Sequence, residues 1–268
     1  MPKHERSGLF PALLKYWRNL RGMSQLDLAL AADVSSRHVS FLETGRSTPS
    51  DEMILRLSTT LDVPLRHVNA MLQAAGFEPA YPEGDLEQNL PDEIAQALQL
   101  MKQHHDPFPL IVVDRVYNVL DMNQGATNMF GTLASELQLD ATNLNLARLT
   151  FDPRLARDVV VNFDEIGRSI LWRMQREVLA DPNFEPLRDV LNDILAMPTV
   201  SDDWREADLT VLSSPALTIH LRMGEQILKF ITTVTSFQSP QSVLLDEMRI
   251  ETWFPVDETT QHTCMHWE

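Results

Sequence analysis

The stretch SQLDLALAADVSSRHVSFLETG, residues 24–45, contains two short helical patterns separated by a tight turn. Ser24 and Ser35 are favourable N-cap residues, because a serine hydroxyl accepts a hydrogen bond from a free backbone N–H of the first helical turn. Ala29 is small enough for the two helices to cross closely, and Asp33 occupies the turn between them. The stretch therefore predicts a helix-turn-helix, a geometry that places the start of the second helix in the major groove of DNA.

Three further helical patterns surround this motif. One carries Leu13, Leu14, Trp17 and Leu20 at helical spacing and ends at Gly22. A second begins after the N-cap Ser50, with Ile54, Leu57 and Leu61 facing inward, and a third covers about 65–74 and ends at Gly76. In the first motif helix we expect Leu26, Ala29 and Leu30 on the apolar side. Residues 1–76 are thus predicted to form an all-α domain.

The pattern RxLRGMSQxxLAxxADVSxxxVSxLETGRSxPS resembles the XRE family of helix-turn-helix proteins, which includes phage repressors and Cro-like proteins. The resemblance covers roughly residues 10–75. It implies that Gln25 and Arg46 contact DNA phosphates, and that Phe41 lies where such proteins place a polar or aromatic base contact. The positions that read bases in this family fall on Ser35, Ser36 and Arg37, with His38 and Ser40 beside them.

Two questions stay open within this segment. Arg18 is either a DNA contact or the partner of Glu43 in a buried ion pair, and the family resemblance favours the pair. The segment as a whole is either a DNA-binding domain or a helical bundle that binds protein, as in some antitoxin-like relatives. The absence of acidic residues from Ser35 until Glu43 favours DNA, because small polar and basic side chains suit base edges and phosphates.

The charge distribution is uneven along the chain. The 268 residues carry a net charge of −16, which is unusual for a protein that binds nucleic acid. Residues 1–76, however, contain nine Lys and Arg against seven Asp and Glu, whereas the remainder contains 13 against 31. Attraction to phosphates would therefore come from a local patch in the N-terminal segment, and the acidic remainder would oppose non-specific DNA binding.

A change of composition separates two domains. FEPAYPEGD, at the start of residues 77–91, contains two prolines, a glycine and acidic residues and is typical of a linker. Residues 92–258 then mix helical patterns at 92–104, 159–180 and 186–196 with strand patterns rich in β-branched and aromatic residues. The predicted strands are 109–114, 116–123, 217–223, 226–237 and 248–256. We expect an α+β domain with an antiparallel sheet, followed by a tail at 259–268.

Three separated segments of this domain carry a second resemblance. They are PLIVVDRVYNVLDMNQGATNMFG (109–131), VVVNFDEIGRSILWRMQREVLADP (159–182) and LKFITTVTSFQSPQSVLLDEMRIETWFPVDE (228–258). Together they are similar to the ligand-binding domain of MmyB-like transcription regulators, which is PAS-like. The resemblance implies a five-stranded sheet, helices over one face, a cavity beneath them and a fatty-acid-like ligand.

The residues themselves are compatible with either a solid core or an apolar pocket. Apolar side chains alternate on the predicted strand 217–223, and a stripe follows the helix 159–180: Phe163, Ile166, Ile170 and Met174. Four aromatic residues either line the cavity or pack in the core: Tyr117, Trp172, Phe230 and Trp253. Arg173 flanks the stripe and is either the anchor of a ligand carboxylate or half of a surface ion pair with Glu177.

Other chemistry finds little support in the sequence. We find no nucleophile elbow, zinc-protease motif, P-loop or dinucleotide fingerprint, so no enzymatic activity is predicted. His262, Cys264 and His266 alternate in the tail, which would place three potential metal ligands on one side of an extended chain. A plain tail is the simpler interpretation, and we assign no metal and no cofactor beyond a possible fatty acid.

The sequence thus predicts a regulator with a DNA operator, a small apolar ligand and a second copy of itself as partners. The dimer is expected because such motifs usually read paired half-sites. With no apolar run long enough for a membrane span and no signal-peptide pattern, we expect a cytoplasmic protein. The alternative is a DNA-binding protein whose C-terminal domain serves only dimerisation or partner recruitment.

Overall fold

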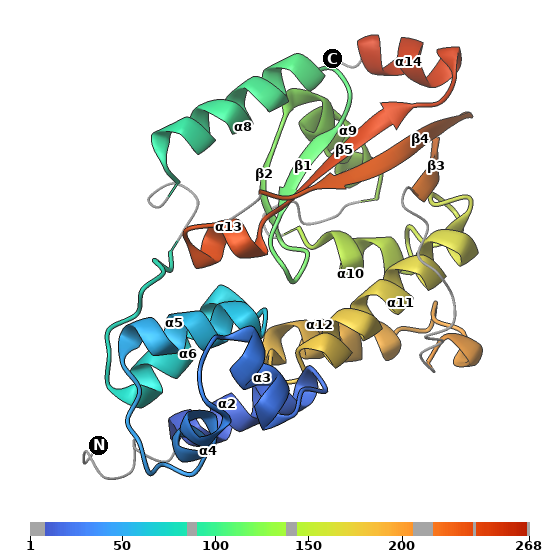
Figure 1. The fold of residues 1–268 in the computed structure, drawn as a ribbon. Helices are drawn as coiled ribbons and strands as arrows, with labels where there is room; N and C mark the ends of the chain where they lie inside the picture. Colours follow the sequence, from blue (N-terminus) through green and yellow to red (C-terminus); the bar gives the residue numbers. More distant parts are fainter. Residues whose placement is uncertain (1–8, 85–89, 138–143, 206–216, 238–239, 267–268) are drawn as a thin grey trace. The chain divides into compact units, whose positions relative to one another are not determined.

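The computed structural model describes residues 9–84, 90–137, 144–205, 217–237 and 240–266. These residues form two compact units, each with its own hydrophobic core (Figure 1). The first contains the described residues up to 84 together with 240–246, and the second contains the described residues from 90 to 237 and from 247 to 266. Residues 240–246 are thus part of the first unit although the chain on both sides of them belongs to the second unit. The sequence did not indicate this arrangement.

The first unit is all-helical, as predicted. Its helices are α2 (Leu9–Leu20), α3 (Gln25–Ala31), α4 (Ser36–Glu43), α5 (Asp51–Thr60) and α6 (Leu65–Ala75). Ser24, Ser35 and Ser50 each accept a hydrogen bond from a backbone N–H in the first turn of the helix that follows, so all three predicted caps are confirmed. Gly76 ends α6 in the left-handed conformation, at φ 92°, which glycine adopts without steric cost.

The core of this unit corrects one expectation about α3. Leu28 and Ala29 are buried, whereas Leu26 and Leu30 are 57% and 73% exposed. Apolar residues flank Ala29 on both sides of this short helix, so their spacing alone could not decide which side faces α4. The other inward residues lie as predicted, with Trp17, Val39 and Leu57 almost fully buried.

Asp246 extends the first unit from a distant part of the sequence. The helix α13 (Val243–Glu247) brings the Asp246 carboxylate to 3.1 Å from the backbone nitrogen of Leu65, the first residue of α6. Pro64, at the N-cap of α6, offers no side-chain hydrogen bond to that helix. Because the first N–H groups of a helix lack intrahelical partners, Asp246 supplies a cap that the local sequence does not. The Val243 N–H also donates to the Pro82 carbonyl, at 3.1 Å.

Part of the predicted linker also packs on the first unit. Phe77 and Tyr81 lie against its core, and the Asn69 side chain exchanges hydrogen bonds with the backbone of Tyr81 at 2.7 and 3.0 Å. Asn69 donates to the Glu83 carboxylate as well, at 3.0 Å. Aromatic side chains in a segment rich in proline and acids therefore continue the helical domain past Gly76.

The second unit is built on a five-stranded antiparallel sheet in the order β2-β1-β5-β4-β3. The strands are β1 (Leu110–Val113), β2 (Val119–Met122), β3 (Leu217–Met223), β4 (Gln226–Thr235) and β5 (Arg249–Pro255). All five lie within the stretches predicted as strands. The hairpin β3–β4 turns at Gly224, which has a φ of 58°, a conformation that favours glycine in short hairpin loops.

Helices cover both faces of this sheet (Figure 1). On one face lie α9 (Gln124–Leu137), α10 (Leu146–Phe151) and α11 (Phe163–Ala180), and α12 (Glu185–Leu195) packs against α10 and α11; their side chains share a core with the sheet. On the other face α8 (Asp92–His105) is tied to β2 by an ion pair from Lys102 to Asp121, at 2.6 Å. The described helices and strands thus establish the α+β class predicted for this domain.

Several expectations about this unit are corrected. The helix expected from residue 159 begins at Phe163, because Val160 and its neighbours pair with the edge strand β3 instead. Helices α9 and α10 were not predicted. The expected tail contains a helix, α14 (Glu258–Met265), whose N-cap Asp257 accepts a hydrogen bond from Thr260.

Candidate DNA interface and ligand cavity

An ion pair holds the helix-turn-helix together from inside. The Arg18 guanidinium donates two hydrogen bonds to Glu43, at 2.6 and 3.0 Å, and a third to the Met23 carbonyl. The two side chains are only 10% and 2% exposed. The burial of Glu43 alone would raise its pKa, but hydrogen bonds from Arg18 and Gln25 hold the pKa below its ordinary value. Arg18 is therefore the structural partner of Glu43 rather than a DNA contact.

Gln25 belongs to the same network. Its amide nitrogen donates to Glu43 at 2.7 Å, which leaves the second hydrogen of the amide for another acceptor. The predicted phosphate contact through this side chain is compatible with the geometry. The network also fixes the Gln25 side chain at the start of α3 before any DNA is bound.

The predicted base-reading residues gather at the start of α4. Ser35, Ser36 and Arg37 are exposed, while His38, Ser40 and Phe41 are half-buried. The Arg37 guanidinium lies 5.1 Å from the centre of the Phe41 ring, which is within cation–π range. Arg46 is exposed in the turn after α4. All these residues belong to one short segment, so α4 presents small polar and basic groups to the solvent, as a recognition helix requires.

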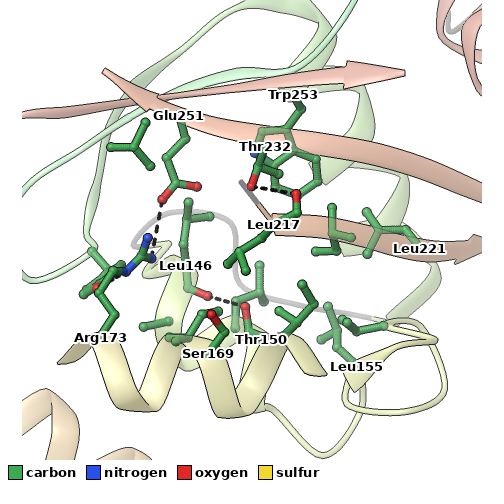
Figure 2. A pocket seen from close by; sticks show the side chains of 18 of the residues that line it. Leu146, Thr150, Leu155, Ser169, Arg173, Leu217, Leu221, Thr232, Glu251 and Trp253 are labelled. Carbon is green, nitrogen blue, oxygen red and sulfur yellow. Dashed lines mark hydrogen bonds and ion pairs between the residues drawn. The ribbon is translucent and has the colours of Figure 1, made fainter. Parts of the chain in front are cut away.

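The second unit contains a cavity of about 250 Å³ between the sheet and helices α9, α10 and α11 (Figure 2). This volume is close to the lower end of small-molecule pockets, about 300–1,000 Å³. Most of the wall is apolar. Its aliphatic and aromatic residues include Phe130, Leu133, Leu146, Ala147, Leu149, Leu155, Val160, Ile166, Ile170, Leu217, Ile219, Leu221, Val234 and Trp253.

Five of the nine residues predicted for the ligand line this cavity: Tyr117, Ile166, Ile170, Arg173 and Trp253. The other four do not. Phe163 packs against Phe151 and Trp204, Phe230 against Trp253, and Met174 is fully buried in the core. Trp172 is half-buried beneath the Arg168 guanidinium. The apolar residues of one helix face contact several neighbouring elements. Only those that lie opposite the cavity line it, and the others pack in the core.

Arg173 lies at the polar end of the cavity (Figure 2). Its Nε donates to the Tyr117 hydroxyl at 3.0 Å, and its guanidinium lies 4.0 Å from the Glu251 carboxylate. The surface ion pair with Glu177 is therefore not the main contact of Arg173. Glu177 lies one helical turn away, and its pKa is raised by burial although Arg173 opposes this.

Glu251 is the functional candidate that sequence reasoning missed. It lies two residues before Trp253 on β5 and therefore on the same face of the sheet. Burial raises the pKa of Glu251, and the nearby Arg173 and the Trp253 side chain oppose this rise. Because side chains alternate between the faces of a strand, the assignment of Trp253 to the cavity also placed Glu251 on the cavity side. A single acidic residue in a strand, however, does not by itself indicate a binding site. The missed apolar lining comes from α9 and α10, which were not predicted, and from β3, β4 and the segment before α11.

The tail does not bring its three potential metal ligands together. In α14, Cys264 is buried, whereas His262 and His266 are exposed and stack on each other with ring centres 4.1 Å apart. A helix turns alternate residues to different sides. Within the described residues, no three His, Cys, Asp or Glu side chains form a group that could hold a metal ion.

Comparisons with known proteins agree with this architecture. The family model of the MmyB-like transcription regulator ligand binding domain matches residues 94–264, and a helix-turn-helix model matches residues 14–68. A search among curated proteins found no match. No described helix is both long and apolar enough to cross a membrane.

Proposed function

The chain belongs to the MmyB-like transcription regulators, which makes it a DNA-binding regulator with a ligand-binding domain, and from this premise we propose that its ligand is fatty-acid-like. The observation that carries the proposal is the cavity, whose walls are mostly apolar and whose charged side chains, Arg173 and Glu251, lie together at one end. A fatty acid has the same division, with a long apolar chain and one anionic head. The sheet order β2-β1-β5-β4-β3 supports the PAS-like assignment of this domain.

The cavity also supports sensing over the alternative in which the domain serves only dimerisation or partner recruitment. A domain with that role alone has no need of a hollow core, because empty space forfeits packing contacts and costs stability. Here the space lies between the sheet and three helices. We therefore propose that ligand binding fills it and stabilises the domain in the bound form.

A chain-length series tests the apolar part of the site. Calorimetric titration with saturated fatty acids of increasing length should show affinity rising about fourfold per added methylene, from about 0.8 kcal/mol for each buried CH₂. The gain should stop when the chain fills the cavity. Mass spectrometry of the natively purified protein should identify a bound ligand of matching length. Affinity that does not depend on chain length would contradict an apolar cavity as the binding site.

Two substitutions locate the site. Ser169→Phe places a large ring in the cavity and should abolish binding, whereas Ser135→Phe, an exposed position of α9 that does not line the cavity, should leave binding unchanged. Arg173→Ala removes the proposed anchor and should reduce both fatty-acid affinity and lipid co-purification. Unchanged co-purification in Arg173→Ala would disprove the anchor.

The regulatory output requires coupling between the cavity and the DNA-binding unit. Strands β4 and β5 supply Thr232, Val234, Glu251 and Trp253 to the cavity, and the described chain between them, residues 240–246, belongs to the N-terminal unit. We propose that ligand binding acts through this connection and alters the placement of two DNA-binding units in a homodimer. An operator obtained by selection from random DNA should bind with different affinity with and without dodecanoate. Equal affinities would exclude this mechanism.

A further inference from the structure

The polar end of the cavity holds an acid as well as a base. Arg173 and Glu251 both point toward the cavity, from α11 and from β5 (Figure 2). Their side chains are 31% and 14% accessible. A ligand head group that reaches Arg173 therefore also meets the Glu251 carboxyl.

The positive charge of Arg173 is already balanced without a ligand. Glu251 lies 4.0 Å from it, and Glu177 follows one turn later on α11. Tyr117, from the β1–β2 turn, accepts the Nε hydrogen bond and contributes no charge while it is protonated. Arg249, Arg115 and Arg176 also act on Glu177, whereas among the described residues Arg173 is the one cation that acts on Glu251. Glu177 therefore has several arginines around it, and Glu251 is the carboxyl group that depends on Arg173.

A ligand carboxylate that reaches Arg173 would add a second negative group beside Glu251. Carboxylates that share one buried site cannot all be ionised, and one of them retains a proton. Of the two protein carboxyls, Glu251 lines the cavity and Glu177 does not. Glu251 is thus the group that a ligand head can contact and with which it can share a proton.

We propose that Glu251 determines the head-group specificity of this cavity by sharing one proton with the carboxyl group of the bound ligand. The inference rests on the proposed fatty-acid-like ligand. The proton comes from the solvent and lies between a Glu251 oxygen and a ligand oxygen, while Arg173 balances the one remaining negative charge. A fatty acid is then bound with a net charge of −1 for the pair instead of −2.

Two observations support this assignment. Burial raises the pKa of Glu251, which favours its protonated form relative to an exposed glutamate. The indole nitrogen of Trp253, on the same strand face, is buried and close enough to Glu251 to lower the pKa of that carboxyl, but it makes no hydrogen bond of good geometry within the described residues. A poorly satisfied buried donor is costly, and a ligand carboxylate oxygen at this end of the cavity would offer it a better-placed acceptor.

The proposal predicts how the affinity depends on pH. Below the pKa of Glu251 in the free protein, the proton is already present and the affinity is constant. Above it, each fatty acid bound requires uptake of a proton, so the affinity falls about tenfold per pH unit. A ligand with a neutral head, such as a fatty alcohol, requires no proton and should show no such fall.

The test is calorimetric titration of the full chain with dodecanoate and with dodecan-1-ol between pH 5.5 and 9. Repetition in buffers of different ionisation enthalpy measures the protons taken up. The wild type should take up close to one proton with dodecanoate at the alkaline end, and none with the alcohol. Glu251→Gln keeps a hydrogen-bond donor without the charge, so it should bind dodecanoate with no proton uptake and at least tenfold more tightly than the wild type at pH 9.

Glu177→Gln is the matched control, because it removes the neighbouring carboxyl that does not line the cavity; it should retain the pH dependence. The same pH slope in the wild type and in Glu251→Gln would overturn the inference but leave the proposed ligand class intact. Failure of dodecanoate to bind at any pH would overturn both. Circular dichroism establishes that each variant is folded.

Discussion

Arg18→Ala should lower the stability of the DNA-binding unit and leave the residues that face DNA unchanged. The substitution leaves the Glu43 carboxylate, 2% exposed, with Gln25 as its remaining side-chain partner. Breaking a buried ion pair by removing one member costs about 3–5 kcal/mol. For a unit of this size, about 4–8 °C of melting temperature is lost per kcal/mol. We therefore expect the melting temperature of the N-terminal unit to fall by about 12 °C or more.

The pH dependence of this loss provides a second check. The pKa of Glu43 is lowered in the folded wild type, so its contribution to stability is present above its unfolded pKa, about 4.3, and is lost as the pH falls through the lower folded value. Without Arg18, burial would instead raise the pKa of Glu43. The stability difference between the variant and the wild type should therefore be largest at pH 7 and shrink toward pH 4, where Glu43 is protonated in the variant.

Calorimetry and hydrogen exchange of peptides from α2 and α4 separate this effect from unfolding of the second unit. Arg37→Ala is the converse control. It should keep the melting temperature, because Arg37 is exposed, yet lose about 1–3 kcal/mol of operator affinity if it reads a base with two hydrogen bonds. A folded Arg18→Ala protein with an unchanged melting temperature and selectively lost DNA affinity would refute the structural role of Arg18.

Three further outcomes follow from single contacts. Asp246→Ala removes the distant cap of α6 and should destabilise the first unit by about 1 kcal/mol; calorimetry that shows no change would argue against the cap. Gly125→Ala would place a Cβ atom close to the backbone carbonyl of Pro107, in conflict with it, so its melting temperature should fall well below that of Gly131→Ala, where the space is open. Cys264 is buried with its pKa raised to about 12, so iodoacetamide at pH 8 should label it only after unfolding, and rapid labelling of the native protein would contradict its burial.

The sequence predicted the first unit well because its signals are local. Ser24, Ser35 and Ser50 cap helices within a few residues of themselves, and Gly76 ends one through its own backbone conformation. The exception is α3, where apolar residues surround Ala29 and only the packing against α4 decides which of them are buried. Capping residues close in the sequence therefore determine where the helices begin and end, and tertiary contacts determine which side of each helix is buried.

The cavity was predictable only in part, because it depends on contacts between residues far apart in the sequence. Arg173 was a candidate from its place beside an apolar stripe, but its partners Tyr117 and Glu251 are 56 and 78 positions away. The apolar pattern of α11 fits a solid core as well as a hollow one. Only the arrangement of sheet and helices separates Ile170, on the cavity wall, from Met174, in the core.

The cap that Asp246 places on α6 has a consequence for the order in which the protein is made. Leu65 and Asp246 are 181 residues apart, and a ribosome that adds about 5–20 residues per second needs roughly 10–35 s to cover that distance. During this interval the nascent helix-turn-helix unit lacks one of its own parts. A chain that stops before the end of β4 lacks Asp246 and therefore lacks this cap. The DNA-binding unit reaches its full stability only in molecules in which most of the ligand-binding domain has also been synthesised.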